Sequence, residues 1–354
     1  MHVALRAWVM RSMSTLRDTK SSALKQLLRP LGKSWASDVS TLCMDPSGEL
    51  VVAVSRGKRV YAGVDGKELV PNEPTLKAGF KQMGFISWSA SEVAFAADGT
   101  LAVRNGEELQ LWSWSKGKLT LTHRARWLIG QKSGMSFTMF DGPLRVTPTV
   151  VASLVKVAKA PRGDDFPDWK DRVIALWARS KFPKAKSLEG NARETKPQVQ
   201  LALEQELGDA AFELTAEGGA VVAESLEYQQ TALTRWDAKG KRTARVVVKF
   251  DVTGIAVAGA SAFVTSSEGE LIAFDEKLTE LRRVKAHKER AVSVREAGAL
   301  LLTTSAKELS VFDAATLKPV TKVAVKGLHD FRAHDVSTSG LVLTNNPPLL
   351  FSVK

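Results

Sequence analysis

Residues 286–313 read AHKERAVSVREAGALLLTTSAKELSVFD, a stretch with three short apolar runs. Residues 292–294 and 309–311 alternate between apolar side chains and serine, and residues 300–305 lie between them. Alternation with a period of two is typical of half-buried strands joined by tight turns. The stretch therefore predicts three successive antiparallel strands, and residues 318–325 supply a fourth.

This arrangement returns at a fixed interval along the chain. An aromatic residue followed by Asp recurs every 38 residues, at Trp236-Asp237, Phe274-Asp275 and Phe312-Asp313, and one further interval reaches Phe351. Looser copies precede them at residues 42–61 and 93–112. A repeat of this length indicates a supersecondary unit that buries its apolar face only by stacking on its own copies.

The best copy resembles the WD repeat. It has His287 near its start, a turn at Ser305, and Val311-Phe312-Asp313 at the end of its third strand, although Ala306 stands where the family has a buried Asp. The resemblance implies an all-β protein, a β-propeller whose blades are four-stranded antiparallel sheets around a central axis. It implies no chemistry.

The spacing of third-strand ends predicts seven blades. The ends fall near residues 64, 113, 237, 275, 313 and 351, so one more blade is needed between 113 and 237. Residues 172–177 fit its third strand and residues 199–203 its outer strand. An alternative for residues 168–182 is an amphipathic helix, because Trp169, Val173, Leu176 and Trp177 share one helical face.

The whole chain, 1–354, is expected to form one domain. Its predicted parts are a closing strand 1–11, a connector 12–38, and blades at 39–82, 83–127, 128–206 (with insertions), 207–250, 251–287, 288–326 and 327–354. The last blade lacks an outer strand, and the strand-like segment 2–8 is expected to complete it and close the ring. The basic, serine-containing first 35 residues are alternatively read as an organellar transit peptide.

Composition narrows the class of protein. The chain of 354 residues has 44% hydrophobic residues, enough for a large core, and one cysteine, Cys43, which excludes an internal disulfide. No apolar run approaches the roughly 18 residues of a membrane span. These features predict a cytoplasmic protein that does not enter a membrane.

The net charge of +12 is concentrated in four segments, each at a predicted outer strand or the turn before it. We name this set the basic girdle: Lys116, Lys118, Arg124, Arg126, Lys239, Lys241, Arg242, Arg245, Arg282, Arg283, Lys285, Lys318 and Lys322. Positive charge on an edge strand prevents association with other sheet edges. It also suits an acidic protein or a nucleic-acid backbone, so both interpretations stay open.

The loop before residue 173 is the longest predicted connection between a second and a third strand. It carries the candidate protein-binding residues Asp164, Asp165, Phe166, Asp168 and Trp169. Tryptophan often anchors protein interfaces, but these aromatic side chains could also pack on their own blade. Calcium bound by the aspartates is a weaker alternative, because the spacing lacks the glycine and terminal Glu of a calcium loop.

No catalytic motif is present. The five histidines are scattered among different repeats, no phosphate-binding loop or nucleophile elbow occurs, and no cofactor or metal is expected. The sequence predicts a non-enzymatic protein–protein interaction scaffold within a multiprotein assembly. One alternative is a binder of nucleic acid or acidic protein through the basic girdle, and a second is a propeller hydrolase or lyase with a metal in its central channel.

Overall fold

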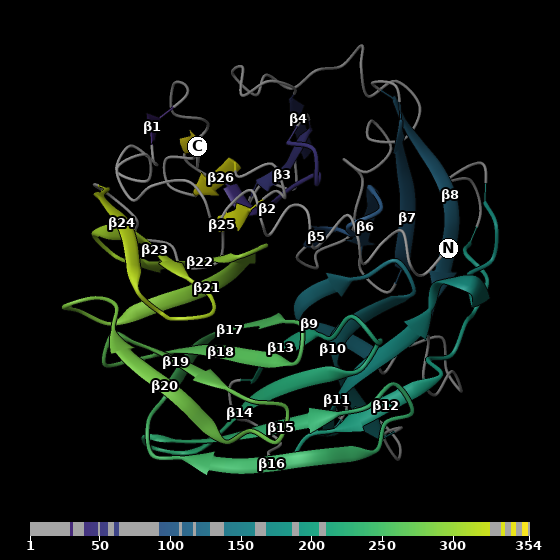
Figure 1. Ribbon diagram of the computed structural model, residues 1–354. Helices are drawn as coiled ribbons and strands as arrows, with labels where there is room; N and C mark the ends of the chain where they lie inside the picture. Colours follow the sequence, from purple (N-terminus) through teal and green to yellow (C-terminus); the bar gives the residue numbers. More distant parts are fainter. Residues whose placement is uncertain are drawn as a thin grey trace, which may run out of the picture.

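The structure is a computed structural model, and it confirms the all-β prediction (Figure 1). The described residues are 29–30, 39–48, 50–55, 60–63, 92–105, 108–115, 118–127, 138–159, 168–185, 191–204, 210–325, 334–336, 341–344 and 349–352. Apart from a 3-10 turn at Arg179–Lys181 (η2), every element assigned in these ranges is a β-strand. Among the same residues, no helix has the length and apolarity that a membrane crossing needs.

Five sheets are complete four-stranded antiparallel blades built from consecutive strands. Their strands are β5 (Glu92–Phe95), β6 (Thr100–Asn105), β7 (Glu108–Ser115), β8 (Lys118–Arg126); β9 (Thr138–Val146), β10 (Val150–Lys159), β11 (Asp168–Ala178), β12 (Val199–Ala202); β13 (Ala210–Leu214), β14 (Ala220–Glu227), β15 (Gln230–Trp236), β16 (Arg242–Val248); β17 (Val252–Ala258), β18 (Ser261–Ser266), β19 (Glu270–Phe274), β20 (Glu280–Lys285); and β21 (Ala291–Ala297), β22 (Leu300–Ser305), β23 (Glu308–Asp313), β24 (Pro319–Ala324).

Two further sheets depart from the predicted plan of seven four-stranded blades. One has three strands in the described chain, β2 (Val39–Met44), β3 (Val51–Ser55) and β4 (Val60–Gly63). The other joins β25 (His334–Val336), β26 (Leu341–Thr344) and β27 (Leu349–Ser352) to β1 (Arg29–Pro30). Within the described residues, complete blades of four consecutive strands therefore number five, where the sequence predicts seven blades.

The predicted closing strand, residues 1–11, lies outside the described residues. The position beside β27 is held instead by β1, a part of the segment predicted as connector, with Arg29 opposite Ser352 and Pro30 opposite Phe351. Proline has no backbone N–H to donate, so a sheet edge is a position that tolerates it. The division of the whole chain into one domain stays a prediction.

The blades radiate from a common centre, and their first strands are its nearest elements (Figure 1). Contacts between first strands run from β5 to β9, β13, β17 and β21, and continue through β25 and β2 back to β5. Apolar clusters fill the space between neighbouring blades. One of them combines Leu233 of β15, Phe250, and Ile272 and Phe274 of β19.

The repeated Asp has a local structural role at the end of the third strand. The Asp275 carboxylate accepts hydrogen bonds from the backbone N–H groups of Lys277 and Thr279, at 2.9 and 2.8 Å. Asp237 accepts equivalent bonds from Lys239 and Lys241, both at 2.9 Å. Such carboxylate-to-backbone bonds stabilise tight turns, which explains why the residue recurs with the period of the blade.

The uncertain segment before residue 182 is a strand, so the helical alternative is wrong. β11 pairs with β10 on one side and with β12 on the other. All six residues from 172 to 177 are buried, more than one face of a surface helix would bury. A strand with neighbouring blades on both faces buries successive residues, and Trp177 is fully buried here.

The connection from β11 to β12 covers the outer edge of the preceding blade. Backbone hydrogen bonds join it to β8, with Arg124 donating to Pro183 (3.0 Å) and Ala185 donating to Thr122 (2.9 Å). Further along, Thr195 donates to Arg126 at 2.7 Å. An outer strand has unpaired backbone groups, and this insertion satisfies several of them on β8.

Candidate functional site

A central channel with a cavity volume of about 1030 Å³ runs between the first strands. Its walls come from β2, β5, β9, β13, β17 and β21, with Asp335 of β25. Apolar side chains line part of it, including Ile255 and Val294, as the repeat predicts. Propeller channels are concave sites where several blades converge, so polar groups inside one are candidates for binding.

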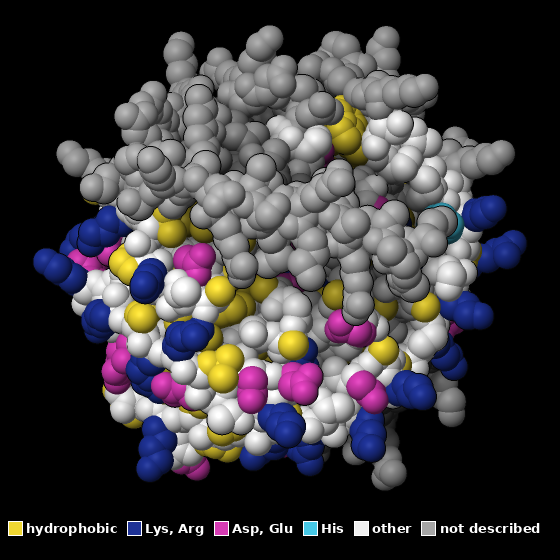
Figure 2. Space-filling view, viewed as in Figure 1, with side chains coloured by type: hydrophobic (Ala, Val, Ile, Leu, Met, Phe, Trp, Pro, Cys, Tyr) yellow, Lys and Arg dark blue, Asp and Glu magenta, His cyan; other side chains and the backbone are white. Residues whose placement is uncertain are grey.

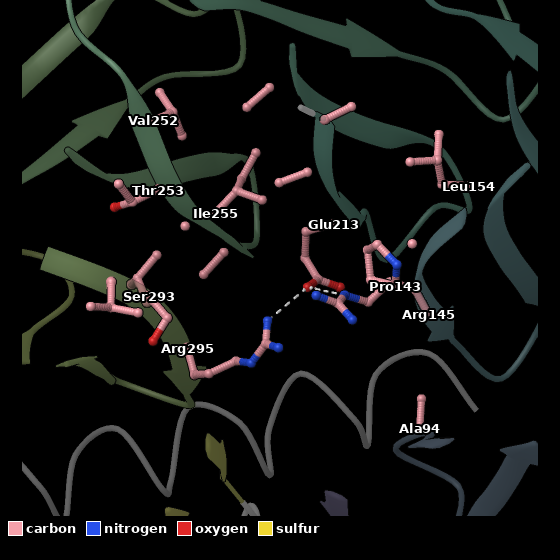
Figure 3. Close-up of a pocket in the computed structure, with 18 of the residues that line it drawn as sticks. Ala94, Pro143, Arg145, Leu154, Glu213, Val252, Thr253, Ile255, Ser293 and Arg295 are labelled. Atoms are coloured by element: carbon pink, nitrogen blue, oxygen red, sulfur yellow. Dashed lines mark hydrogen bonds and ion pairs between the residues drawn. The ribbon is translucent and has the colours of Figure 1, made fainter. Parts of the chain in front are cut away.

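Three charged side chains converge in this channel (Figure 3). Arg145 Nε lies 2.8 Å from Glu213 Oε2, and Arg295 Nη1 lies 3.5 Å from the same oxygen. They come from β9, β13 and β21, so the cluster joins three blades. We name Arg145, Glu213 and Arg295 the channel triad.

Strand alternation positions the channel triad. Leu144, Phe212 and Val294 each precede a triad residue, and all three are buried in the clusters between blades. Because successive side chains point to opposite faces of a strand, the following residue is directed away from that cluster. The alternation of apolar residues that indicates the first strands does not predict these charges.

Burial affects the ionisable groups of the channel. Burial, followed by the nearby Arg145 charge, lowers the pKa of Arg295, but a guanidinium stays protonated in proteins. Burial raises the pKa of the Cys43 thiol, and the Asp335 carboxylate acts in the same direction. The Asp335 carboxylate also accepts a hydrogen bond of 2.8 Å from the backbone N–H of Met44.

One mouth of the channel carries an exposed aromatic side chain. Tyr228, in the turn between β14 and β15, lines the cavity and is 86% exposed. The turn is held in place because the Gln229 N–H donates to Asp251 Oδ1 (3.0 Å), while Thr231 Oγ1 donates to the Phe250 carbonyl (3.0 Å). Gln229, whose N–H donates to Asp251, has a φ of 57°, which lies in the left-handed region.

The predicted protein-binding loop is the connection between β10 and β11. Asp164, Asp165 and Phe166 lie outside the described residues. Asp168 and Trp169 begin β11, opposite Lys159 and Ala158. This connection joins a second to a third strand, like the turn of Tyr228, and the two blades are neighbours through β9 and β13.

The basic girdle lies on outer strands and the turns before them, apart from Lys116, which is outside the described residues. Figure 2 shows Lys and Arg side chains gathered at the rim of the molecule with acidic side chains among them. Arg245 Nη2 and Arg242 Nη1 lie 2.7 and 3.0 Å from the Glu204 carboxylate. Hydrogen bonding to Glu204 raises the pKa of Arg245 and lowers that of the carboxyl group.

Further girdle residues are also paired. Arg283 contacts Glu270 and Glu280, both at 2.8 Å, and Lys322 lies 3.2 Å from Glu308. Such exposed pairs contribute about 0–1 kcal/mol each to stability. They reduce the charge available to a partner.

Arg124 does not belong to an accessible perimeter, which corrects the prediction for β8. Its side chain is buried and paired with Glu108, with Nε 2.7 Å from Oε1. The neighbouring blade's insertion pairs with the backbone of Arg124 and Arg126 and covers this edge. The sequence could not show which blade edge a distant insertion would cover.

His287 has a packing role within its blade. The ring is buried, with Nδ1 2.9 Å from Glu308 Oε1 and Nε2 2.8 Å from Thr303 Oγ1. Burial lowers its pKa, although Glu308 acts in the opposite direction. Among the described residues, no three His, Cys, Asp or Glu side chains group as metal ligands do. The expectation of no metal and no cofactor stays a prediction for the whole chain.

The chain is similar to WD40 β-propellers of known structure. The WD40 β-propeller domain of Doa1 superposes with a TM-score of 0.57 and 12% sequence identity, covering 93% of this chain and 97% of that one. In total 1187 solved chains match, so the likeness identifies the fold and no particular activity. No protein-family model matches the sequence. No curated protein matches it either.

Proposed function

We propose that the protein is a non-enzymatic protein–protein interaction scaffold in a multiprotein assembly. The partner would bind the face formed by the connections between second and third strands, around the channel mouth. Tyr228 is the observation that carries this proposal, because an aromatic ring that is 86% exposed lies on a turn fixed by Asp251. Rigid tyrosine side chains give large contact areas at low entropic cost and are frequent at interface centres.

The neighbouring connection extends the same surface. The chain enters β11 with Asp168 and Trp169 in the blade next to Tyr228. The exposed Arg290 and the half-buried Asp251 also line the cavity, so a charged border adjoins the exposed tyrosine. An apolar anchor with a polar border is typical of protein interfaces.

Affinity purification of the tagged full chain from its native host tests this proposal. Tyr228→Ala should reduce partner recovery at least about tenfold, the effect of losing an interface hot spot. Leu281→Ala is the matched control, because Leu281 is exposed on the outer strand β20, away from this face. Equal recovery with Tyr228→Ala and the control would contradict the proposed surface.

A second variant tests the predicted loop. Phe166→Ala with Trp169→Ala should abolish recovery of the same partner while leaving the thermal unfolding midpoint within about 2 °C of the parent, the shift expected for a mild surface change. Loss of the partner together with a large drop in the midpoint would assign these side chains to packing on their own blade.

The alternative function, binding of nucleic acid or acidic protein through the basic girdle, has one favourable observation. Lys239, Lys241 and Lys318 lie in exposed turns at the rim. Retention on heparin that falls steeply with salt would support it, since release of counterions makes such binding salt-dependent. No retention at low salt would exclude it.

We extend the proposal to the closure of the ring and to the location of the protein in the cell. We propose that β1 on β27 closes the ring, because the first strands already neighbour one another in an unbroken cycle. A cytoplasmic location is proposed from composition, since the single cysteine, Cys43, is a buried free thiol. A closed, rigid ring would hold the binding turns at fixed separations.

A further inference from the structure

The channel triad carries more positive than negative charge. Two guanidinium groups share one oxygen of the Glu213 carboxylate, at 2.8 and 3.5 Å (Figure 3). One formal positive charge therefore remains within the triad itself, and Asp335 of β25 is a further carboxylate whose charge acts on Arg295. In a narrow channel the effective dielectric constant is lower than in water, which strengthens the attraction of a further anion.

Hydrogen-bond donors also remain. Each guanidinium has five N–H donors. Arg145 uses Nε toward Glu213 and Nη1 toward the Leu144 carbonyl (3.0 Å). Among the described residues, Arg295 donates a side-chain hydrogen bond only to Glu213, through Nη1. In the described part of the chain, Arg145 Nη2 and the Nε and Nη2 of Arg295 have no acceptor.

The channel has space beside these donors, in the layer of first-strand residues that contains Glu213 and Arg295. Pairing with the second and third strands puts Glu213, Ala256 and Arg295 at equivalent positions of three successive blades. Ala256 places only a methyl group in this layer, and Ala94 lines the cavity from β5 (Figure 3). Small side chains here leave part of the 1030 Å³ cavity open next to the arginines.

We propose that Arg145 and Arg295 form a binding site for the oxyanion group, carboxylate or phosphate, of a small molecule in the central channel. Guanidinium donors match both groups geometrically, and they form short charge-assisted hydrogen bonds with them. Glu213 contacts both guanidinium groups and sets the affinity by competing for their donors. The site lies inside the ring, apart from the exposed Tyr228.

Isothermal titration calorimetry of the full chain tests this with inorganic phosphate and succinate as separate probes, at constant ionic strength adjusted with chloride. Saturable binding of one equivalent of either probe is expected, and the tighter probe identifies the oxyanion. Arg145→Gln and Arg295→Gln should each weaken it at least about tenfold, the effect of losing hydrogen bonds to a charged group. Arg242→Gln is the matched control, a carboxylate-paired arginine on the rim.

Glu213→Gln should change the affinity for the probe in the opposite direction. The neutral amide competes less for the guanidinium donors, so the probe should bind more tightly than to the parent. If the arginine variants fail to fold, the parent and Glu213→Gln still decide the question. Absence of saturable binding by the parent, equal loss with Arg242→Gln, or unchanged affinity with Glu213→Gln would overturn the proposal. Tyr228→Ala should leave probe binding unchanged, which separates this site from the partner surface.

Discussion

His287 links three parts of its blade through one buried imidazole. The ring lies between Thr303 of β22 and Glu308 of β23, and Glu308 also pairs with Lys322 of β24. The second, third and fourth strands of the blade are thereby connected to the segment that precedes its first strand. The resemblance to the WD repeat indicates His287 from the sequence, but it does not predict that Glu308 is its acidic partner.

His287→Ala should therefore lower the free energy of unfolding by about 1–3 kcal/mol, because it leaves a cavity and buried groups without their partners. Urea denaturation of the variant measures this loss. Lys288→Ala, at the exposed neighbouring position, is the control and should stay within about 0.5 kcal/mol of the parent. Equal stability of both variants would contradict a structural role for the imidazole.

The same imidazole predicts a pH effect. Burial lowers its pKa, so the folded state binds this proton less readily than the unfolded state, whose value is about 6.5. This contribution to stability is present above pH 6.5 and is lost as the pH falls through the folded value. The stability difference between parent and His287→Ala should narrow from pH 7.5 to 5.5 in urea denaturation. A stability difference that widens as the pH falls would contradict a lowered pKa of His287.

Gly269 makes a close approach that excludes a side chain. Its φ is +81°, and a Cβ there would overlap the carbonyl oxygens of His287 and Glu289. Gly269→Ala should cost more than about 1 kcal/mol beyond Gly259→Ala, whose φ is also positive but whose Cβ would meet open space. Thermal unfolding of the two variants compares them. Equal losses of stability in the two variants would mean that the positive φ, and not the close approach at Gly269, determines the cost of the substitution.

Among the elements, the insertion between β11 and β12 protects the edge of β8. Ala185→Pro removes the N–H that donates to Thr122, and the proline ring disturbs the adjacent pairing. Hydrogen exchange should accelerate at the Arg124 amide, which donates to Pro183, while the β21–β24 blade keeps its protection. Unchanged exchange at β8 would show that the insertion does not hold this edge.

Strands were predictable from the sequence where the repeat recurs in both pattern and spacing. In three blades an Asp at the end of the third strand stabilises the following turn, so Asp237, Asp275 and Asp313 mark the ends of these strands in the sequence. β11 was also predicted, because the interval between repeats required one more blade. The two-residue β1 has no such signal, and a strand of that length leaves no periodicity to detect.

The channel triad was not predictable in the same way. Equivalent first-strand positions of three successive blades hold Glu213, Ala256 and Arg295, so the side chain at this position changes while the fold repeats. The only sequence signal is Arg295 directly after the alternating Val292-Ser-Val294 run. Tyr228 was missed because a turn residue has no period. Its signal is an aromatic residue between two strand-like segments.

At the scale of the whole molecule, the first strands surround one channel. Neighbouring first strands form a cycle that passes through β25 and β2, and β1 pairs with β27 at the outer position of the last sheet. The turn of Tyr228, the channel triad and the basic girdle all take their positions from this ring. Closure of the ring therefore depends on the pairing of β1 with β27.

A designed disulfide tests this pairing, through Arg29→Cys with Ser352→Cys in a Cys43→Ser background. These residues are opposite one another in the β1–β27 pair, at a Cα separation that suits a disulfide. Mild oxidation should give an intramolecular crosslink and a higher unfolding temperature, whereas Arg29→Cys with Thr243→Cys on β16 should not crosslink. Absence of the crosslink, or crosslinks only between molecules, would contradict the closed ring.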